Sequence, residues 1–218
     1  MKYIINILKW ILNIVFLFFK VFPVKKKVTF ISRQSNQITE DFLMLKNELK
    51  ISAPDTKLVF LCKKLEGNIL DKLLYCFHML MQMYHIATSQ VVILDSYCIC
   101  ISILKQRKSL TVIQIWHALG SLKRFGLSIV GEGEGSKKAV AEAMDMHKNY
   151  SYILTSSNVC LQYFAEAFGY DHKQMKVMSL PRVDKLTDRN LIDETIRNIY
   201  NVYPCFKEKK SHCIRSYF

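Results

Sequence analysis

The chain has 218 residues, of which 50% are hydrophobic and 22% are charged. This composition excludes wholesale disorder, and the length accommodates one large domain or two small ones with a sizeable core. The 31 Lys and Arg residues exceed the 18 Asp and Glu residues by 13, which predicts an anionic partner such as nucleic acid, acidic lipid or a phosphorylated substrate.

Residues 1–27 differ in composition from the rest of the chain, because they contain six lysines and no acidic residue. Helical spacing collects the polar positions of this segment into one narrow stripe on an otherwise apolar helix: Lys2, Asn6, Lys9, Asn13 and Lys20. We predict an amphipathic helix that lies in a membrane interface with its lysines toward the headgroups. A buried core helix and a transmembrane span are the alternatives, although three polar side chains interrupt the apolar run that a span requires.

The end of this segment supports membrane attachment over secretion. The expected helix stops near Pro23, and no small-residue cleavage site of a signal peptide follows it. The basic cluster at 25–27 would add roughly 1 kcal/mol per charge against an anionic cytoplasmic leaflet. We therefore expect a peripheral protein on the cytoplasmic face of the cell membrane.

From residue 28 onward, short β-rich runs alternate with longer helical patterns. The apolar runs predict six strands, at 28–32, 57–62, 90–95, 110–116, 152–156 and 176–180. Helices are predicted at 39–50, 68–86, 136–148, 158–168 and 188–202, with Ser157 or Asn158 capping the fourth. Strands that are near-continuous apolar runs, each followed by a helix, indicate an α/β fold with a mostly parallel sheet covered on both faces.

The seven cysteines show no CxxC spacing, so neither a zinc ribbon nor a thioredoxin-type site is expected. We expect reduced thiols in the cytosol that pack as small hydrophobes, including Cys62, Cys76 and Cys160, with disulfides as the alternative. No HExxH motif is present, and His78 and His85 lie in an apolar helix where packing is favoured over metal ligation. His147 and His172 lie in charged, surface-like contexts, and His212 lies in a basic tail.

Ligands of parallel α/β sheets bind at the carboxyl ends of the strands, which directs attention to the loops after residues 116, 156 and 180. His117 directly follows one predicted strand, and an imidazole there can take a proton from a hydroxyl near neutral pH. A structural histidine held by the backbone is an equally open interpretation. Lys123 and Arg124 follow in the same loop and are placed to neutralise phosphate oxygens.

The run GLSIVGEGEGS at 126–136 has glycine spacing reminiscent of a phosphate loop. It follows a basic loop and not a strand, and Glu132 and Glu134 would repel an anion, so a flexible connection or a lid is favoured. Nucleic acid is disfavoured as a partner because the aromatic residues are not interleaved with Lys and Arg.

The segment WHALGSLKRFG resembles the WHAxGAxKxFG signature of the CDP-glycerol glycerophosphotransferase family of teichoic-acid and capsule polymerases. Residues 145–170 are similar to the family's block of a strand, paired serines and a helix, and SLPRVDKL at 179–186 is similar to its G-x-PR-x-D element. Ser121 stands where the family usually has Ala. The resemblance covers roughly residues 28 to 205, and three motifs in the same order make it specific.

The resemblance implies the N-terminal, acceptor-side half of a GT-B architecture, in which two Rossmann-like domains face across a cleft. It implies that His117 is the catalytic residue, that Lys123, Arg124, Ser156, Ser157 and Arg182 bind substrate or phosphate, and that the remaining motif positions are structural: Trp116, Gly120, Gly126, Pro181 and Asp184. No metal and no cofactor is expected, since CDP-glycerol or another CDP-alditol is the donor substrate.

The implied function is transfer of an alditol phosphate from a CDP-alditol to a membrane-linked polyol-phosphate or glycan acceptor, in teichoic acid or capsular polysaccharide synthesis. We expect a membrane-associating helix at 1–27, a Rossmann-like domain with the start of an interdomain connection at 28–205, and a basic tail at 206–218 that departs from the family. A truncated copy without the nucleotide-binding domain is therefore expected. A catalytically inactive membrane- or polymer-binding remnant is the alternative.

Overall fold

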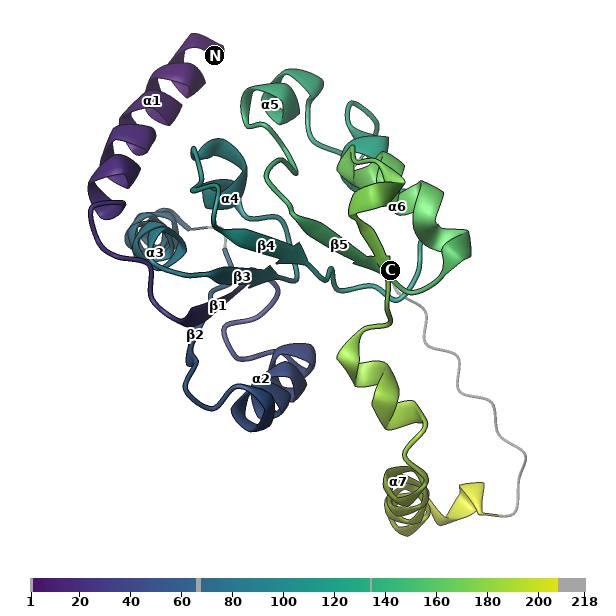
Figure 1. Ribbon diagram of the computed structural model, residues 1–218. Helices are drawn as coiled ribbons and strands as arrows, with labels where there is room; N and C mark the ends of the chain where they lie inside the picture. Colours follow the sequence, from purple (N-terminus) through teal and green to yellow (C-terminus); the bar gives the residue numbers. More distant parts are fainter. Residues whose placement is uncertain (1, 66–67, 134, 208–218) are drawn as a thin grey trace. The chain divides into compact units, whose positions relative to one another are not determined.

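The computed structural model describes residues 2–65, 68–133 and 135–207 of the 218-residue chain (Figure 1). The structure divides into two compact units, Met1–Leu180 and Pro181–Phe218. This division differs from the boundaries drawn from the sequence, because residues 1–27 belong to the first unit and the break falls after Leu180 instead of after residue 205.

One parallel sheet of six strands forms the centre of the first unit, in the order β2-β1-β3-β4-β5-β6. The strands are β1 (Lys27–Ser32), β2 (Lys57–Cys62), β3 (Val91–Leu94), β4 (Thr111–Gln114), β5 (Tyr152–Thr155) and β6 (Met175–Val177). The order reverses at β1 and β3, as in doubly wound Rossmann-like sheets. The predicted α/β class and all six predicted strands are confirmed.

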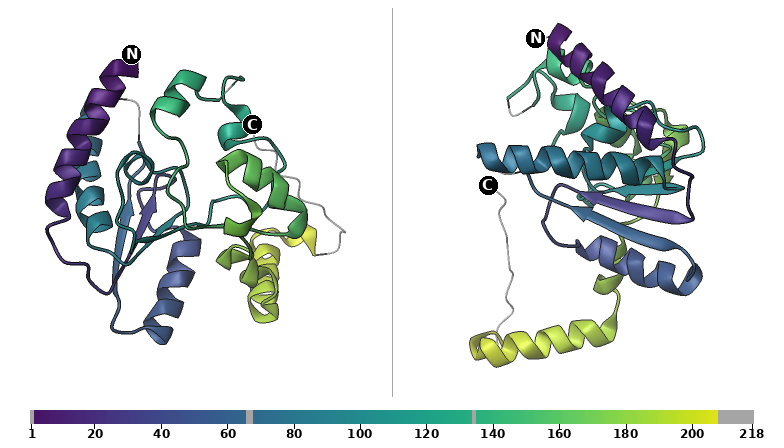
Figure 2. Two further views of the ribbon diagram at one scale, coloured as in Figure 1. Left: turned by 45° about the horizontal axis from the view of Figure 1, so that its top comes forward. Right: turned by 90° about the vertical axis from the view of Figure 1, so that its left-hand side faces the viewer.

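Helices cover both faces of this sheet, with α2 on one face and α1 and α3 on the other (Figures 1 and 2). The helices of the first unit are α1 (Lys2–Phe19), α2 (Glu40–Ser52), α3 (Ile69–Ala87), α4 (Ile99–Ile103), α5 (Lys138–Ala143) and α6 (Leu161–Phe168). The second unit contains α7 (Arg189–Val202), which begins at an Asp188 cap. The five-residue helix α4 was not predicted.

The helix predicted at 136–148 is much shorter in the structure, because α5 ends at Ala143. Asp145, His147 and Asn149 then adopt positive φ angles of 48°, 64° and 70°. Three left-handed positions in five residues cannot continue a right-handed helix, so the chain turns instead of extending it.

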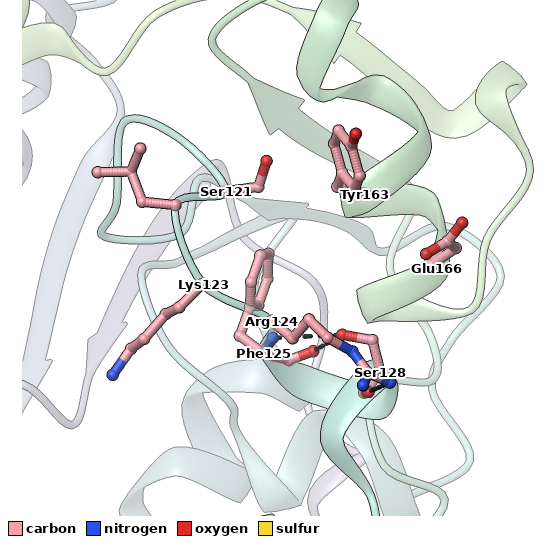
Figure 3. Close-up of a pocket in the computed structure, with 8 residues that line it drawn as sticks. Ser121, Lys123, Arg124, Phe125, Ser128, Tyr163 and Glu166 are labelled. Carbon is pink, nitrogen blue, oxygen red and sulfur yellow. Dashed lines mark hydrogen bonds between the residues drawn. The ribbon is translucent and has the colours of Figure 1, made fainter.

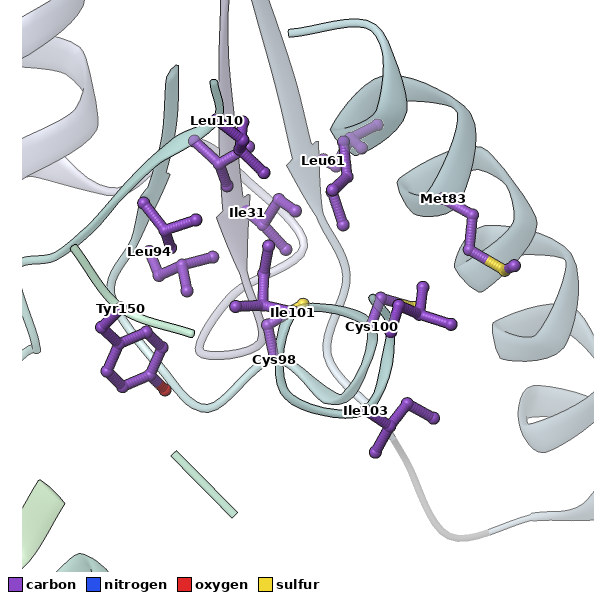
Figure 4. Close-up of a cluster of buried hydrophobic side chains, with 14 of the residues drawn as sticks. Ile31, Leu61, Met83, Leu94, Cys98, Cys100, Ile101, Ile103, Leu110 and Tyr150 are labelled. Carbon is purple, nitrogen blue, oxygen red and sulfur yellow. The ribbon is translucent and has the colours of Figure 1, made fainter. Parts of the chain in front are cut away.

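The core lies where α3 and α4 meet the sheet (Figure 4). Every residue of β1 is buried, as expected for a strand in the interior of a parallel sheet. Cys98 and Cys100 pack inside this core, whereas Cys76 is exposed, so the expectation that Cys76 packs as a core residue is wrong. None of the six described cysteines is bridged, and Cys213 lies outside the described residues.

Three residues of the polar stripe, Lys9, Asn13 and Lys20, face the protein body, whereas Asn6 is exposed. The Asn13 side chain accepts a hydrogen bond from the Lys105 N–H at 2.8 Å and donates one to the Ile103 carbonyl at 3.1 Å. The Lys9 ammonium donates to the Ala143 carbonyl at 3.0 Å and pairs with the Asp145 carboxylate. Carbonyl oxygens at a partly buried interface need donors, and this stripe supplies them.

The expectation that the stripe points its lysines toward headgroups is therefore wrong for Lys9, and also for Lys20, whose ammonium donates to the Lys105 carbonyl. Phe16 is 1% exposed and joins the core, so it anchors the helix on the same side. The opposite side of α1 is apolar and exposed, and includes Tyr3, Ile4, Ile7, Trp10, Ile14, Leu17 and Phe18.

No helix within residues 2–65, 68–133 and 135–207 combines the length and the apolar character that a membrane span requires.

Lys27 opens β1 as a buried cation, with 2% of its surface exposed. Its ammonium lies 3.2 Å from Nδ1 of His85 and donates to the Thr88 hydroxyl at 2.5 Å. Burial, followed by the charges of Lys57 and Lys25, lowers the pKa of Lys27 to about 8. No acidic side chain is among these described contacts, so the folded state disfavours the charged form.

We expect Lys27→Met to raise the free energy of unfolding at pH 7 by about 1 kcal/mol, because it removes a poorly compensated buried charge. The folded pKa of about 8 lies below the ordinary value of 10.5. The unfolded chain therefore binds more protons between these values, and wild-type stability rises with pH through this window. Urea unfolding at pH 7, 9 and 10.5 should show that rise flattened in Lys27→Met and unchanged in Lys26→Met, whose side chain is exposed. If the free energy of unfolding of Lys27→Met rises with pH as much as that of the wild type, Lys27 is not the group responsible for the rise.

Candidate active site

Gln114 is the last residue of β4, and its side chain joins the loop after β3 to the loop after β4. Its side chain is fully buried; Oε1 accepts a hydrogen bond from the Trp116 N–H at 3.0 Å, and Nε2 donates to the Ser96 carbonyl at 3.1 Å. Gln114 is a site residue that was not predicted from the sequence. Its amide is the one polar side chain near the end of the apolar run LTVIQIW. A buried amide needs hydrogen-bond partners, so this position could have been predicted to bind neighbouring loops.

Trp116 carries the backbone strain of this loop, with φ at +62°. A bulky residue in the left-handed region costs about 1–3 kcal/mol and persists only where its surroundings hold it. Here the Trp116 ring stacks on Phe125 at 5.1 Å between centroids and meets the edge of Phe168 at 5.2 Å. The packed ring fixes the turn that immediately precedes His117.

His117 is half-buried, with its ring 4.2 Å from that of Trp116. Its Nδ1 lies 2.8 Å from the backbone carbonyl oxygen of Asp95 and 3.4 Å from the amide Nε2 of Gln34, so the carbonyl contact is the shorter and stronger one. A carbonyl oxygen can only accept, so Nδ1 carries the hydrogen and Nε2 is the basic nitrogen of the neutral ring. The backbone contact expected of a structural histidine is thus present, and it also prepares the other nitrogen to accept a proton.

Asp95 follows β3 directly and is 2% exposed. Burial raises the pKa of its carboxyl, while the hydroxyls of Ser32 and Ser96 and the positive charge of a protonated His117 act in the opposite direction. Asp95 was not predicted from the sequence, although it is a single acidic residue directly after the apolar run QVVIL.

The paired serines lie next to this loop. The Ser156 hydroxyl donates to the Leu119 carbonyl, which ties the end of β5 to the loop that carries His117. The Ser157 hydroxyl accepts from the Cys160 N–H at 3.4 Å, so Ser157 is the predicted cap of the turn leading into α6. Hydrogen bonds from Ser157 and then from Ser121 and Ser156 lower the pKa of the Cys160 thiol. Substrate binding by Ser156 and Ser157 stays a prediction.

Arg124 forms an ion pair within its own loop region. Its Nη1 donates to the Glu132 carboxylate at 2.8 Å, and its Nη2 donates to the Ser128 carbonyl. Glu132 was expected to repel an anion; in the structure it is itself the anion that Arg124 binds. Lys123 is exposed, and Glu134 lies outside the described residues.

Gly126 is required by the close packing of this loop on α6. Its φ is +60°, and a Cβ there would lie 2.3 Å from the Ala167 carbonyl oxygen. Gly120 differs, since a Cβ at that position would meet no atom within 4 Å. Of these two motif glycines, the structure gives a steric reason only for Gly126.

His147 is 1% exposed, so the expectation of a surface position is wrong. The charged neighbours that led to that expectation, Asp145 and Lys148, pair with each other, while a left-handed turn directs His147 inward. Its ring meets the edge of Phe168 at 4.9 Å, and its Nδ1 lies 3.1 Å from the Tyr150 hydroxyl. Burial lowers the pKa of His147 to about 4, so it is neutral at neutral pH.

His78 and His85 are partly buried, in agreement with packing, and burial lowers the pKa of both. Within the part of the chain that the structure describes, no three His, Cys, Asp or Glu residues gather in a way that could hold a metal ion. His212 lies outside the described residues.

The third motif lies in the second unit. Pro181, Arg182 and Asp184 belong to the short 3-10 helix Pro181–Leu186. The Asp184 carbonyl accepts from the Thr187 hydroxyl at 2.8 Å, which closes this turn. Substrate binding by Arg182 stays a prediction.

Residues 14–214 match the family described as CDP-Glycerol:Poly(glycerophosphate) glycerophosphotransferase. The chain is 30% identical over 184 residues to a teichoic acid ribitol-phosphate primase of Bacillus spizizenii, covering 84% of this chain and 47% of the relative. It is 31% identical over 107 residues to a teichoic acid glycerol-phosphate primase of Bacillus subtilis, covering 49% of this chain and 28% of the relative.

The fold is also similar to that of the wall teichoic acid polymerase TagF. The TM-score is 0.63 at 14% identity, over 93% of this chain and 52% of the TagF chain. The chain therefore spans about half the length of these relatives or less.

We expect Gly126→Ala to lower the free energy of unfolding by about 2–4 kcal/mol, because the alanine combines a left-handed backbone with a clash against backbone atoms of α6. Gly120→Ala is the matched control and should change stability by less than about 0.5 kcal/mol. Chemical denaturation followed by circular dichroism measures both. Equal stability of the two variants contradicts the packing role given to Gly126.

Proposed function

The chain belongs to the CDP-glycerol:poly(glycerophosphate) glycerophosphotransferase family, and on this premise we propose that it is the acceptor-side half of an alditol-phosphate transferase. The donor is a CDP-alditol such as CDP-glycerol, and the acceptor is a membrane-linked polyol phosphate or glycan of teichoic acid or capsule synthesis. The observation that carries this proposal is the 2.8 Å contact between His117 Nδ1 and the Asp95 carbonyl, which makes Nε2 a proton acceptor.

His117 Nε2 takes the proton of the terminal acceptor hydroxyl as that oxygen attacks the β-phosphorus of the CDP-alditol. A new bond joins the acceptor oxygen to the β-phosphorus. The bond from the β-phosphorus to the bridging oxygen of CMP breaks, and CMP leaves with the electron pair. The Asp95 carbonyl keeps its hydrogen bond with Nδ1 through this step, so the ring is held in one orientation.

The cationic residues of the same loop neutralise phosphate charge. Arg124 presents a planar guanidinium that suits bidentate contacts with phosphate, and Lys123 adds a second positive charge. Ser156, Ser157 and Arg182 are proposed as further substrate-binding residues on the basis of the family motifs.

We also propose that the exposed apolar side of α1 docks on the cytoplasmic face of the cell membrane. Trp10 and Phe18 are 67% and 65% exposed, and the neighbouring helix α3 adds Phe77 at 68%. Contiguous apolar surface of this kind marks an interaction site. An anionic lipid surface is the occupant that suits the charge, because the chain carries a net charge of +13 and the exposed Lys25 and Lys26 follow α1.

In a complete enzyme that contains this chain, His117→Ala should lower turnover at least a hundredfold, because the acceptor hydroxyl loses its general base. Release of CMP from radiolabelled CDP-glycerol measures the loss. His172→Ala, at an exposed position, is the matched control and should retain activity. Near-wild-type transfer by His117→Ala would remove His117 from the mechanism. The 218-residue chain assayed alone distinguishes an active transferase from a remnant that only binds membrane or polymer.

The double variant Trp10→Ser, Phe18→Ser should bind vesicles of anionic phospholipid at least about tenfold more weakly, because two large apolar side chains no longer enter the bilayer interface. Vesicle co-sedimentation measures the affinity. Ile51→Ser is the matched control, since Ile51 is 79% exposed on α2, which covers the other face of the sheet. Unchanged binding by the double variant, or an equal loss in Ile51→Ser, refutes docking through α1.

A further inference from the structure

A cavity of about 170 Å³ opens between the loop that follows His117 and helix α6 (Figure 3). We call it the loop–helix cavity. The loop contributes Ser121, Lys123, Arg124 and Phe125, and α6 contributes Tyr163 and Glu166. The volume is below the roughly 300–1,000 Å³ of pockets that enclose drug-sized ligands, so one small polar unit fits better than a nucleotide.

The cavity is connected to the proposed base by stacked rings. Phe125 lines the cavity and stacks on Trp116 with centroids 5.1 Å apart and an interplanar angle of 22°. The Trp116 ring is in turn 4.2 Å from the His117 ring. A ligand in the cavity therefore lies beside the reacting position and not in it.

One side of the cavity is cationic. Arg124 holds Glu132 at 2.8 Å, but the two side chains are 64% and 60% exposed. An ion pair this exposed contributes about 0–1 kcal/mol, so an incoming phosphate can replace the carboxylate. A phosphate oxygen can accept the charge-assisted hydrogen bond that Nη1 now gives to Glu132, while Nη2 keeps its bond to the Ser128 carbonyl.

The other side of the cavity is suited to hydroxyl groups. Tyr163 and Glu166 are three residues apart and project from the same side of α6 (Figure 3). A carboxylate accepts hydrogen bonds from hydroxyls, and a phenol can donate or accept. The negative charge of Glu166 repels phosphate, so it directs the phosphate end of a ligand toward Arg124.

These two sides together match a phosphorylated polyol. We propose that the loop–helix cavity binds one alditol-phosphate unit of the acceptor, with Arg124 on the phosphate and Tyr163 and Glu166 on the hydroxyls. The inference rests on the proposed function, because it takes this chain to be the acceptor side of the enzyme. It adds that the enzyme recognises a unit of the chain next to the reacting hydroxyl.

Equilibrium binding by the 218-residue chain tests the proposal, with ribitol 5-phosphate, glycerol 3-phosphate and inorganic phosphate as probes in NMR titrations of the ¹⁵N-labelled protein. We expect at least one alditol phosphate to bind about fivefold or more tightly than inorganic phosphate, a modest preference of about 1 kcal/mol. Glu166→Gln and Tyr163→Phe should remove this preference. Tyr163→Phe should leave the affinity for inorganic phosphate unchanged, whereas Glu166→Gln should leave it unchanged or raise it, because a repelling charge is lost. Arg124→Gln should weaken all three probes.

Glu48→Gln, an exposed position on α2, is the matched control and should behave as wild type. Equal affinities for alditol phosphate and inorganic phosphate in the wild type overturn the proposal. It is also overturned if the preference survives in Glu166→Gln, or if phosphate binding survives in Arg124→Gln. The readout is binding and not catalysis, so these failures are distinguishable from a failure of the CMP-release assay.

Discussion

The site depends on one hydrogen bond, from Nδ1 of His117 to the carbonyl oxygen of Asp95. This bond joins the loop after β4 to the loop after β3, and it exists because Leu94 and Gln114 are register partners at the ends of these adjacent strands. Parallel strands bring their carboxyl ends to one edge, so residues that are 22 positions apart in the chain meet there. The buried amide of Gln114 fixes the same two loops a second time. The two neutral tautomers of a histidine exchange freely in solution. Here the Asp95 carbonyl selects the tautomer of His117 that carries its hydrogen on Nδ1.

Beneath the His117 loop, an aromatic layer compensates for the strain in the loop. Trp116 stacks on Phe125, and both rings meet the edge of Phe168, so the left-handed turn at Trp116 is held by packing on two sides. Gly126 permits this layer to close on α6, because any side chain there would enter the space of the Ala167 carbonyl. His147 completes the layer as a neutral ring. The family motif WHALGSLKRFG thus combines the proposed base, His117, with residues that shape the loop around it.

Helix α1 illustrates how a correct pattern can be assigned to the wrong environment. The sequence predicts a polar stripe on this helix, and the structure places Lys9 and Asn13 of that stripe against the protein body. The stripe nevertheless binds carbonyl oxygens and the Asp145 carboxylate of the protein body, which leaves the apolar side exposed. A lysine ammonium can be stabilised by carbonyl and carboxylate groups of the protein, by lipid headgroups or by water. The amphipathic pattern alone does not show which of these partners it has.

The sequence by itself determined the α/β class, the six strands, the position of His117 at the end of a strand, a cap at Ser157 or Asn158, and the family. These features follow from local periodicity or from contiguous motifs, so they need no knowledge of distant contacts. The tertiary structure decided the roles of Gln114 and Asp95, the burial of His147, the Arg124–Glu132 pair and the orientation of α1. Each of these depends on contacts between segments that are far apart in the chain or on backbone turns that periodicity does not encode. Burial and hydrogen bonding are properties of the assembled chain, and for that reason they became visible only in three dimensions.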